Sequence, residues 1–243
     1  AFSLKQSYMT YVLNNYVKEE LMGYDSIFSE EDLKHGEFDA QILSKINLYV
    51  GRSEEELYRA FNLLTESKSK QINKVLVNRM LGVNTDNSEE FQKANIIPKT
   101  VRIEENGSIK ESISFPAFKF TEIINQNWET CYLKKELETT KYMFFVFKKD
   151  KDDYIFKGIK LWNMPQIDIE TSVMDMWKKT YNTIKSGNIV RYIKDGKRKT
   201  NFVGISKNDV CHVRPHARDA KDTFKLPVKD QLTGVTEYTK QCF

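Results

Sequence analysis

Tyr142-Met143-Phe144-Phe145-Val146-Phe147 is the longest purely apolar run in the chain, and it decides the class of fold. Six consecutive residues of this kind, four of them aromatic and one β-branched, are typical of a buried β-strand. The charged residues 148–153 that follow predict a turn, and a second strand should then run through Trp162. The sequence therefore indicates a domain built around a sheet.

Helical patterns precede these strands. Apolar residues at helical spacing predict a helix over residues 8–21, which Gly23 would end. Ser53-Glu54-Glu55-Glu56 has the form of a capping box, which opens a helix carrying Leu57 and Phe61. A third helix is expected over residues 70–81, ending at Gly82.

The spacing of apolar residues changes on either side of the central strands. Residues 95–102 read as a strand, and Asn106-Gly107 predicts a hairpin into an alternating segment at 109–115. Beyond Pro165, apolar residues between positions 173 and 184 predict one long helix that stops at Gly187. Further strands are expected at 188–192, 200–205, 210–214 and 235–243. We predict a mixed α/β (α+β) domain, with a central mixed sheet flanked by helices.

The composition excludes several classes of protein. The 243 residues are 40% hydrophobic and 30% charged, and the mean hydropathy is −0.57. The longest apolar run, residues 142–147, is far shorter than the roughly 20 apolar residues that a membrane span needs, so we expect no such span. The three cysteines are far apart and form no CxxC pair, so we expect a reducing, cytoplasmic location. The chain begins at Ala1 rather than methionine, and we expect it to be a fragment of a longer protein.

Positive charge is concentrated near the C-terminus. Residues 185–243 contain 13 Lys/Arg and 6 Asp/Glu, a surplus of +7, so the first 184 residues sum to −3 against the total of +4. A basic region on a near-neutral body is typical of a protein that binds a polyanion. An ordinary solvated, lysine-rich surface gives the same pattern.

Several kinds of site are not supported by any motif. The chain contains neither a GxxxxGK[ST] nor a GxGxxG phosphate-binding loop, and it has no GxSxG elbow. His212 and His216 lie four residues apart on a predicted strand, and further zinc ligands are missing, with Cys211 on the opposite face. We therefore interpret both histidines as polar surface or DNA-facing residues.

The segment 211–222 is the most informative part of the basic region. A strand ends at Arg214, and Pro215 fixes the direction in which the chain leaves it, before a predicted short helix that carries more cations. An arginine held in this way suits bidentate recognition of a guanine edge. Lys197-Arg198-Lys199 follows the turn Asp195-Gly196 and suits DNA phosphates, although exposed basic turns are common on soluble proteins.

Four segments, in this order, resemble the MutH-type endonucleases. They are Tyr49-Val50-Gly51-Arg52-Ser53-Glu54-Glu55-Glu56-Leu57, the helix of residues 70–82, Arg214-Pro215-His216-Ala217 with Ala220-Lys221, and Tyr238-Thr239-Lys240-Gln241-Cys242-Phe243. The resemblance runs from about residue 49 to the end. It implies a restriction-endonuclease-like fold with a DNA-binding cleft, and hydrolysis of DNA with Mg²⁺ held by carboxylates.

The family's catalytic positions fall on residues that have lost most of that chemistry. The resemblance puts Asn78 in place of a helical glutamate, Glu89 or Glu90 in place of an aspartate, and Ile97-Pro98-Lys99 in place of the ExK signature. An isoleucine cannot coordinate Mg²⁺, which prefers oxygen ligands. The degenerate positions Asn78, Glu90, Ile97 and Lys99 thus imply a domain that binds no metal and does not cut DNA.

The DNA-reading positions are better preserved. The resemblance implies base recognition by Arg214, Pro215, His216 and Tyr238, although tyrosine at position 238 is equally suited to a strand core. The residues expected on the DNA backbone are Lys70, Lys197, Arg198, Lys199, Arg218, Lys221 and Lys240.

These positions imply a particular role for the chain. It resembles the C-terminal half of two-domain restriction enzymes that act on GATC sites, with residues 1–45 as an N-terminal helical connection and 46–243 as the DNA-binding domain. Such a half binds GATC duplexes and promotes cleavage by an N-terminal, Mg²⁺-dependent half of the same chain. Two alternatives stay open: an active GATC endonuclease using Glu90 and Lys99 with a displaced acid such as Glu104, and a domain that docks another protein.

Overall fold

The computed structural model describes residues 4, 6–16, 25–29, 31–32, 37–64, 71–84 and 88–243. The chain divides into two compact units, each made of separate stretches of sequence. Unit 1 contains residues 1–111 and 139–163, and unit 2 contains residues 112–138 and 164–243. The boundary expected at residue 45 lies inside a helix of unit 1. Among the described residues, no helix is both long and apolar enough to cross a membrane.

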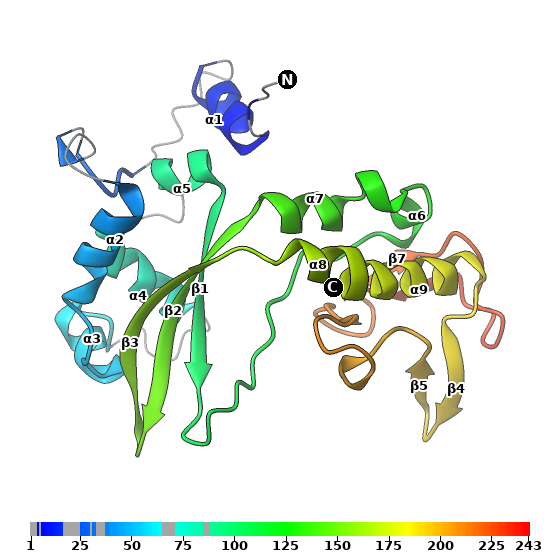
Figure 1. Ribbon diagram of the computed structural model, residues 1–243. Coiled ribbons are helices and arrows are strands. Elements are labelled where there is room, and N and C mark those ends of the chain that lie inside the picture. The colour runs from blue at the N-terminus through cyan, green and yellow to red at the C-terminus, as the bar shows by residue number, and fades with distance from the viewer. Residues whose placement is uncertain are drawn as a thin grey trace. The chain divides into compact units, whose positions relative to one another are not determined.

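Unit 1 is built on a three-stranded mixed sheet (Figure 1). Its strands are β1 (Ile96–Ile103), β2 (Lys141–Asp150) and β3 (Asp153–Trp162). β2 is central, pairing parallel to β1 and antiparallel to β3. The predicted strands at 95–102 and 142–147 are therefore confirmed, and so are the strand expected to run through Trp162 and the mixed sheet flanked by helices.

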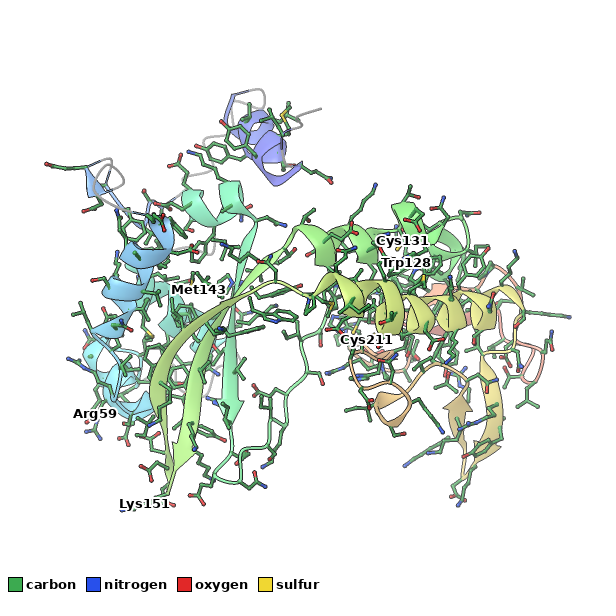
Figure 2. All side chains as sticks on the ribbon, viewed as in Figure 1. Arg59, Trp128, Cys131, Met143, Lys151 and Cys211 are labelled. Atoms are coloured by element: carbon green, nitrogen blue, oxygen red, sulfur yellow. The ribbon has the colours of Figure 1, made fainter. Side chains whose placement is uncertain are left out.

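The expected turn at 148–153 is shorter than predicted. Asp150 pairs with Asp153, so β2 continues through the charged residues, and only Lys151 and Asp152 form the turn. Lys151 has a φ of 56° and lies at the tip of the hairpin (Figure 2). The turn is this tight because backbone pairing with β3 holds residues 148–150 in the strand even though their side chains are charged.

In the described parts of unit 1, five α-helices accompany the sheet (Figure 1). They are α1 (Gln6–Tyr16), α2 (Phe38–Asn47), α3 (Glu54–Ala60), α4 (Ile72–Leu81) and α5 (Glu89–Ala94). α2 and α3 contact β3, whereas α4 and α5 contact β1. The core between helices and sheet contains Ile42, Ile46, Leu57, Leu76, Met80, Met143, Phe145, Phe147 and Phe156.

The helix boundaries follow from local chemistry. The Ser53 hydroxyl accepts the Glu56 N–H at 3.2 Å, and the Glu56 carboxylate accepts the Ser53 N–H at 2.8 Å, which confirms the capping box. Gly82 ends α4 with a φ of 81°, as expected. The predicted helix at 8–21 is confirmed for residues 8–16, while 17–21 and Gly23 lie outside the described residues.

The predicted hairpin at Asn106-Gly107 is only partly right. The turn forms, with Gly107 at a φ of 81°, but pairing stops at a single bridge between Ile103 and Ile109, and 109–115 is not a strand. Ile109 is 54% exposed. The alternating apolar residues therefore bury too little surface to extend the ladder.

Unit 2 packs helices and three small two-stranded sheets around a second core. Its helices are α6 (Phe120–Ile123), α7 (Tyr132–Thr139), α8 (Gln166–Asp168) and α9 (Met174–Lys185), with a π-helical turn (Ile169–Val173) before α9. Its strands pair as β4 (Val190–Lys194) with β5 (Lys197–Thr200), β6 (Arg214–Pro215) with β9 (Gln241–Cys242), and β7 (Thr223–Lys225) with β8 (Glu237–Thr239). The predicted long helix before Gly187 is confirmed.

A buried lysine supports the helices of this unit. Lys134 on α7 donates to Glu129 at 2.7 Å and pairs with Glu170 at 2.6 Å, close to Trp128. Trp128 and Cys131 lie together in this region (Figure 2). Hydrogen bonds to Glu129 and Glu170 raise the pKa of Lys134, so its ammonium group stays charged in this buried position.

Several strands predicted near the C-terminus are shorter than expected. β5 ends at Thr200, and Phe202 and Val203 are buried without belonging to a strand. The strand expected at 210–214 is reduced to the two residues of β6. The side chains of Phe202 and Val203 pack into the core. Their backbone is held by single hydrogen bonds, such as that from the Val213 N–H to the Val203 carbonyl at 2.8 Å, and not by a continuous ladder.

The prediction of a short helix after Pro215 is wrong. Residues 216–222 form bends and turns. In a helix their backbone N–H groups would donate to backbone carbonyls, but here the side chains of two aspartates accept several of them. Asp219 accepts the N–H groups of Lys221 at 2.8 Å and Asp222 at 3.1 Å, and Asp222 accepts that of Arg218 at 3.0 Å.

Candidate functional site

A pocket in unit 1 gathers three of the four expected catalytic positions. Asn78 on α4 and Ile97 and Lys99 on β1 line the same cavity of about 490 Å³. The parallel pairing of β1 with β2 fixes the backbone of Ile97 and Lys99, and contacts of α4 with β1 bring Asn78 to them. The fold thus brings Asn78, Ile97 and Lys99 to one pocket.

The fourth position, Glu90, is engaged elsewhere. Its carboxylate accepts the N–H groups of Ile27 at 2.9 Å and Phe28 at 3.1 Å, and the hydroxyl of Ser26 at 2.8 Å. Glu90 therefore anchors the segment 25–29 to α5. It is not among the residues that line the pocket.

Two other acidic residues that the sequence offered are also occupied. Glu89 binds the Tyr11 hydroxyl at 2.5 Å and the Lys93 ammonium, and these hydrogen bonds lower the pKa of Glu89. Glu104 pairs with Lys110 at 3.0 Å, which lowers its pKa, and it accepts the Tyr154 hydroxyl at 3.1 Å. Neither residue lines the pocket.

The lining of this pocket does not fit Mg²⁺. Its described polar residues carry amide, hydroxyl and ammonium groups, and none of them is a carboxylate: Asn73, Lys74, Asn78, Ser88, Gln92, Lys99 and Thr100. Two lysines repel a divalent cation, and Mg²⁺ is ordinarily bound through carboxylates. Throughout the described parts of the chain, no three His, Cys, Asp or Glu residues are grouped as metal ligands.

Two of the expected base-reading residues, Arg214 and Pro215, form the short strand β6. Arg214 pairs with Cys242 and Pro215 with Gln241 across β6 and β9. The His216 N–H donates to the Lys240 carbonyl at 2.8 Å just beyond the ladder. Arg214 is half-buried, whereas Pro215 and His216 are exposed. Arg214 is thus carried by a backbone segment that is paired with β9.

Nearby His212 is half-buried, close to Arg214 in the sequence. Burial lowers its pKa, and the positive charge of Arg214 lowers it further. Among the described residues, no group of His, Cys, Asp or Glu side chains that could hold a metal ion includes His212.

Tyr238 lies in the core of unit 2. Its ring packs edge-on against Phe120 and Phe202, at centroid distances of 6.3 and 6.1 Å, and only 6% of the residue is exposed. The Arg198 guanidinium lies 5.0 Å from the ring centroid, and burial raises the pKa of the phenol. This is the environment of a strand core residue, the alternative that the sequence left open.

The residues expected on the DNA backbone have different surroundings. Lys197, Arg198 and Lys199 lie on β5 and are exposed, as are Arg218 and Lys221 in the turns after β6. Lys240 is half-buried, because it pairs with Asp222 at 2.5 Å and lies over the Phe224 ring. Lys70 lies outside the described residues.

One carboxylate that organises this region was missed by the sequence analysis. Asp230 is fully buried, and its Oδ2 accepts the N–H groups of Ile189 at 3.1 Å and Val190 at 2.7 Å, where β4 begins. It thereby fixes the root of the β4–β5 hairpin that carries Lys197–Lys199. The segment Asp230-Gln231-Leu232-Thr233-Gly234 has the composition of a turn closed by an aspartate side chain, which was the available signal.

Comparisons with known proteins identify a similar enzyme. No family model matches the chain. A curated protein, the type II restriction enzyme Sau3AI of Staphylococcus aureus, is 35% identical to it over 255 aligned positions. That alignment covers 94% of this chain and 52% of the enzyme, so the chain spans about half the length of this relative.

Proposed function

We propose that this chain is a DNA-binding domain of a type II restriction endonuclease, with the MutH-type fold that its sequence resembles. The similarity to a type II restriction enzyme over nearly the whole chain supports a role on DNA. The exposed cations of β5 and of the turns after β6 supply a surface that phosphates favour.

The domain is proposed to be non-catalytic, and the pocket in unit 1 is the observation that carries this proposal. By the family resemblance, Asn78 and Ile97 take the positions of metal-binding carboxylates, and the pocket has no described carboxylate in its lining. Glu90 is bound to the backbone of residues 27 and 28 and is therefore not available. Cleavage would belong to an N-terminal half of the longer protein, and the Mg²⁺ that it needs would be bound there.

We further propose that the domain binds GATC duplexes and that this binding promotes cleavage by the other half. Arg214 is the proposed base-reading residue, with His216 beside it, because both leave a strand whose end is fixed by pairing with β9. Tyr238 would support that surface from within the core and hold Arg198 over its ring. The target sequence and the effector role rest on the family resemblance, and the proposed cytoplasmic location rests on the cysteine pattern.

A second candidate is an endonuclease that is active in its own right. The similarity to an enzyme and the presence of Lys99 on the pocket favour it. It requires a carboxylate from outside the described lining, and the acidic residues at positions 89, 90 and 104 are engaged in other contacts.

Fluorescence anisotropy tests these proposals directly. The chain would be titrated against a GATC duplex and a scrambled duplex at two salt concentrations, with Ca²⁺ in place of Mg²⁺. A preference of roughly 10³ or more for GATC is expected of a specific binder. Equal affinity for both duplexes would contradict the GATC proposal, and absence of binding would favour a protein-docking role.

A cleavage assay separates the first two candidates. With Mg²⁺ and a GATC duplex, the non-catalytic proposal predicts no product above background for either the wild type or Lys99→Ala. Mg²⁺-dependent cutting that disappears in Lys99→Ala would instead establish the active endonuclease.

A further inference from the structure

A second hollow of about 490 Å³ lies on unit 2, and four cations from different elements line it. Lys179 comes from α9, Arg191 from β4, Lys199 from β5, and Lys207 from a 3-10 turn (Ile205–Lys207). Thr200, Asn201 and Ser206 supply hydroxyl and amide groups among the cations, and the buried Phe202 and Val203 supply the apolar part of the lining. Three of the four cations were not singled out by any sequence pattern.

A bulge in the hairpin explains why Arg191 faces this hollow. Val190 pairs with Thr200 and Tyr192 with Lys199, so Arg191 is an extra residue on β4 (hairpin labelled β4 and β5 in Figure 1). A bulge of this kind changes the direction of a side chain. The Val190 N–H, next to the bulge, donates to the buried Asp230 carboxylate, which holds the backbone on that side of Arg191 in place.

The charge of the hollow is mostly uncompensated. No carboxylate lines it among the described residues. Lys179 is paired with Asp175 at 2.7 Å. Arg191, Lys199 and Lys207 form no ion pair with any described residue of the chain, although Arg191 lies over the Tyr192 ring at 5.3 Å. Cations gathered in one hollow repel each other, and an anion bound between them relieves that repulsion.

The surroundings of the hollow favour a polyanion over a single small anion. In the β4–β5 ladder, Tyr192 is opposite Lys199 and Lys194 is opposite Lys197, so these four side chains share one face of the hairpin. All four are exposed. The positive surface therefore continues from the hollow along the hairpin, as a row of backbone phosphates requires.

We propose that this hollow binds a backbone phosphate of duplex DNA, with Arg191 and Lys207 as its principal ligands. The inference rests on the proposed function and deepens it, because it extends the DNA-contacting surface to α9 and the 3-10 turn. A guanidinium gives a phosphate two parallel hydrogen bonds, and the lysines act as point charges around it. Contacts of this kind position the duplex and carry no sequence information.

The test compares Arg191→Gln and Lys207→Gln with a matched control, Lys178→Gln. Lys178 is the sequence neighbour of Lys179 on α9 and is also exposed, but it does not line the hollow. Each substitution removes one positive charge. Binding to GATC and scrambled duplexes would be measured over a series of salt concentrations, and circular dichroism would establish that each variant is folded.

Both hollow variants should weaken binding about fivefold or more, equally on the two duplexes, and lower the slope of log affinity against log salt by about 0.9 for one lost phosphate contact. Lys178→Gln should leave the slope close to that of the wild type. If the wild type prefers GATC but the hollow variants behave like Lys178→Gln, the inference is overturned and the proposed function stands.

If the wild type binds both duplexes equally and only the hollow variants reduce the slope, the phosphate site stands and the GATC proposal fails. If the wild type binds neither duplex, both proposals are overturned.

Discussion

Replacing Asp230 should destabilise unit 2 more than any single surface substitution, because its buried carboxylate joins two segments. Oδ2 accepts the N–H groups of Ile189 and Val190, and Oδ1 accepts the Thr233 N–H at 2.8 Å and hydroxyl at 2.7 Å. In Asp230→Ala, the buried N–H groups at 189 and 190 lose their partner. Each such group costs about 1–3 kcal/mol, so we expect a loss of about 2–6 kcal/mol in the free energy of unfolding.

The conservative variant separates charge from shape. Asp230→Asn keeps one acceptor oxygen, so it should cost less than Asp230→Ala, about 1–3 kcal/mol. Urea unfolding followed by tryptophan fluorescence suits this measurement, because Trp128 and Trp177 lie in the core of unit 2. A change below about 0.5 kcal/mol in Asp230→Ala, the range of ordinary surface substitutions, would refute the reasoning.

The same carboxylate predicts a dependence on pH. Burial by itself would raise the pKa of Asp230, but hydrogen bonds from Val190, Thr233 and Ile189 outweigh it, and the pKa is lowered overall. The charged form thus contributes stability that is complete above the unfolded-state pKa of about 3.9 and is lost as the pH falls through the lower folded-state value. The stability difference between wild type and Asp230→Asn should therefore shrink below about pH 4, and a constant difference from pH 7 to pH 3 would contradict this account.

Three further predictions concern unit 2. Gly187→Ala should destabilise it by about 1–3 kcal/mol in urea unfolding, because φ is 70° and a Cβ would lie 2.7 Å from the Lys229 carbonyl; an unchanged midpoint would show that the backbone adjusts freely. Arg214→Ala should weaken GATC binding by about 1–3 kcal/mol, whereas an equal loss on scrambled DNA would exclude base reading. Burial, with a smaller effect of Asp175, raises the pKa of Cys211 to about 12, so iodoacetamide at pH 8 should label it far more slowly in the folded chain than in urea, and equal rates would contradict its burial.

The sequence predicts those elements whose determinants are local. The apolar run 142–147 becomes β2, and the capping box at Ser53 begins α3, because strand burial and N-terminal capping depend on residues close together in the chain. The pocket residues Asn78, Ile97 and Lys99 were expected together only through the family resemblance. Their meeting depends on α4 packing against β1, which no local pattern encodes.

Other features depend on contacts that spacing does not reveal. The turns at 216–222 replace a helix because Asp219 and Asp222 take the backbone donors, and composition alone does not decide between these arrangements. The bulge that directs the Arg191 side chain toward the hollow on unit 2 arises from the register of β4 with β5. Glu90 looked suitable for a metal, but backbone donors from residues 27 and 28 occupy it.

The division of the chain into interleaved units has a consequence for its synthesis on the ribosome. Residues 1–111 contain β1, but its partner β2 starts at Lys141, after 112–138, which belong to unit 2. β2 begins 38 residues after the end of β1, so at about 5–20 residues per second β1 is made roughly two to eight seconds before its partner begins to appear. During that interval, β1 and the apolar faces of α4 and α5 must not pair with other segments of the nascent chain or with other chains. Pro98, which has no N–H to offer, makes the waiting strand a poorer template for aggregation.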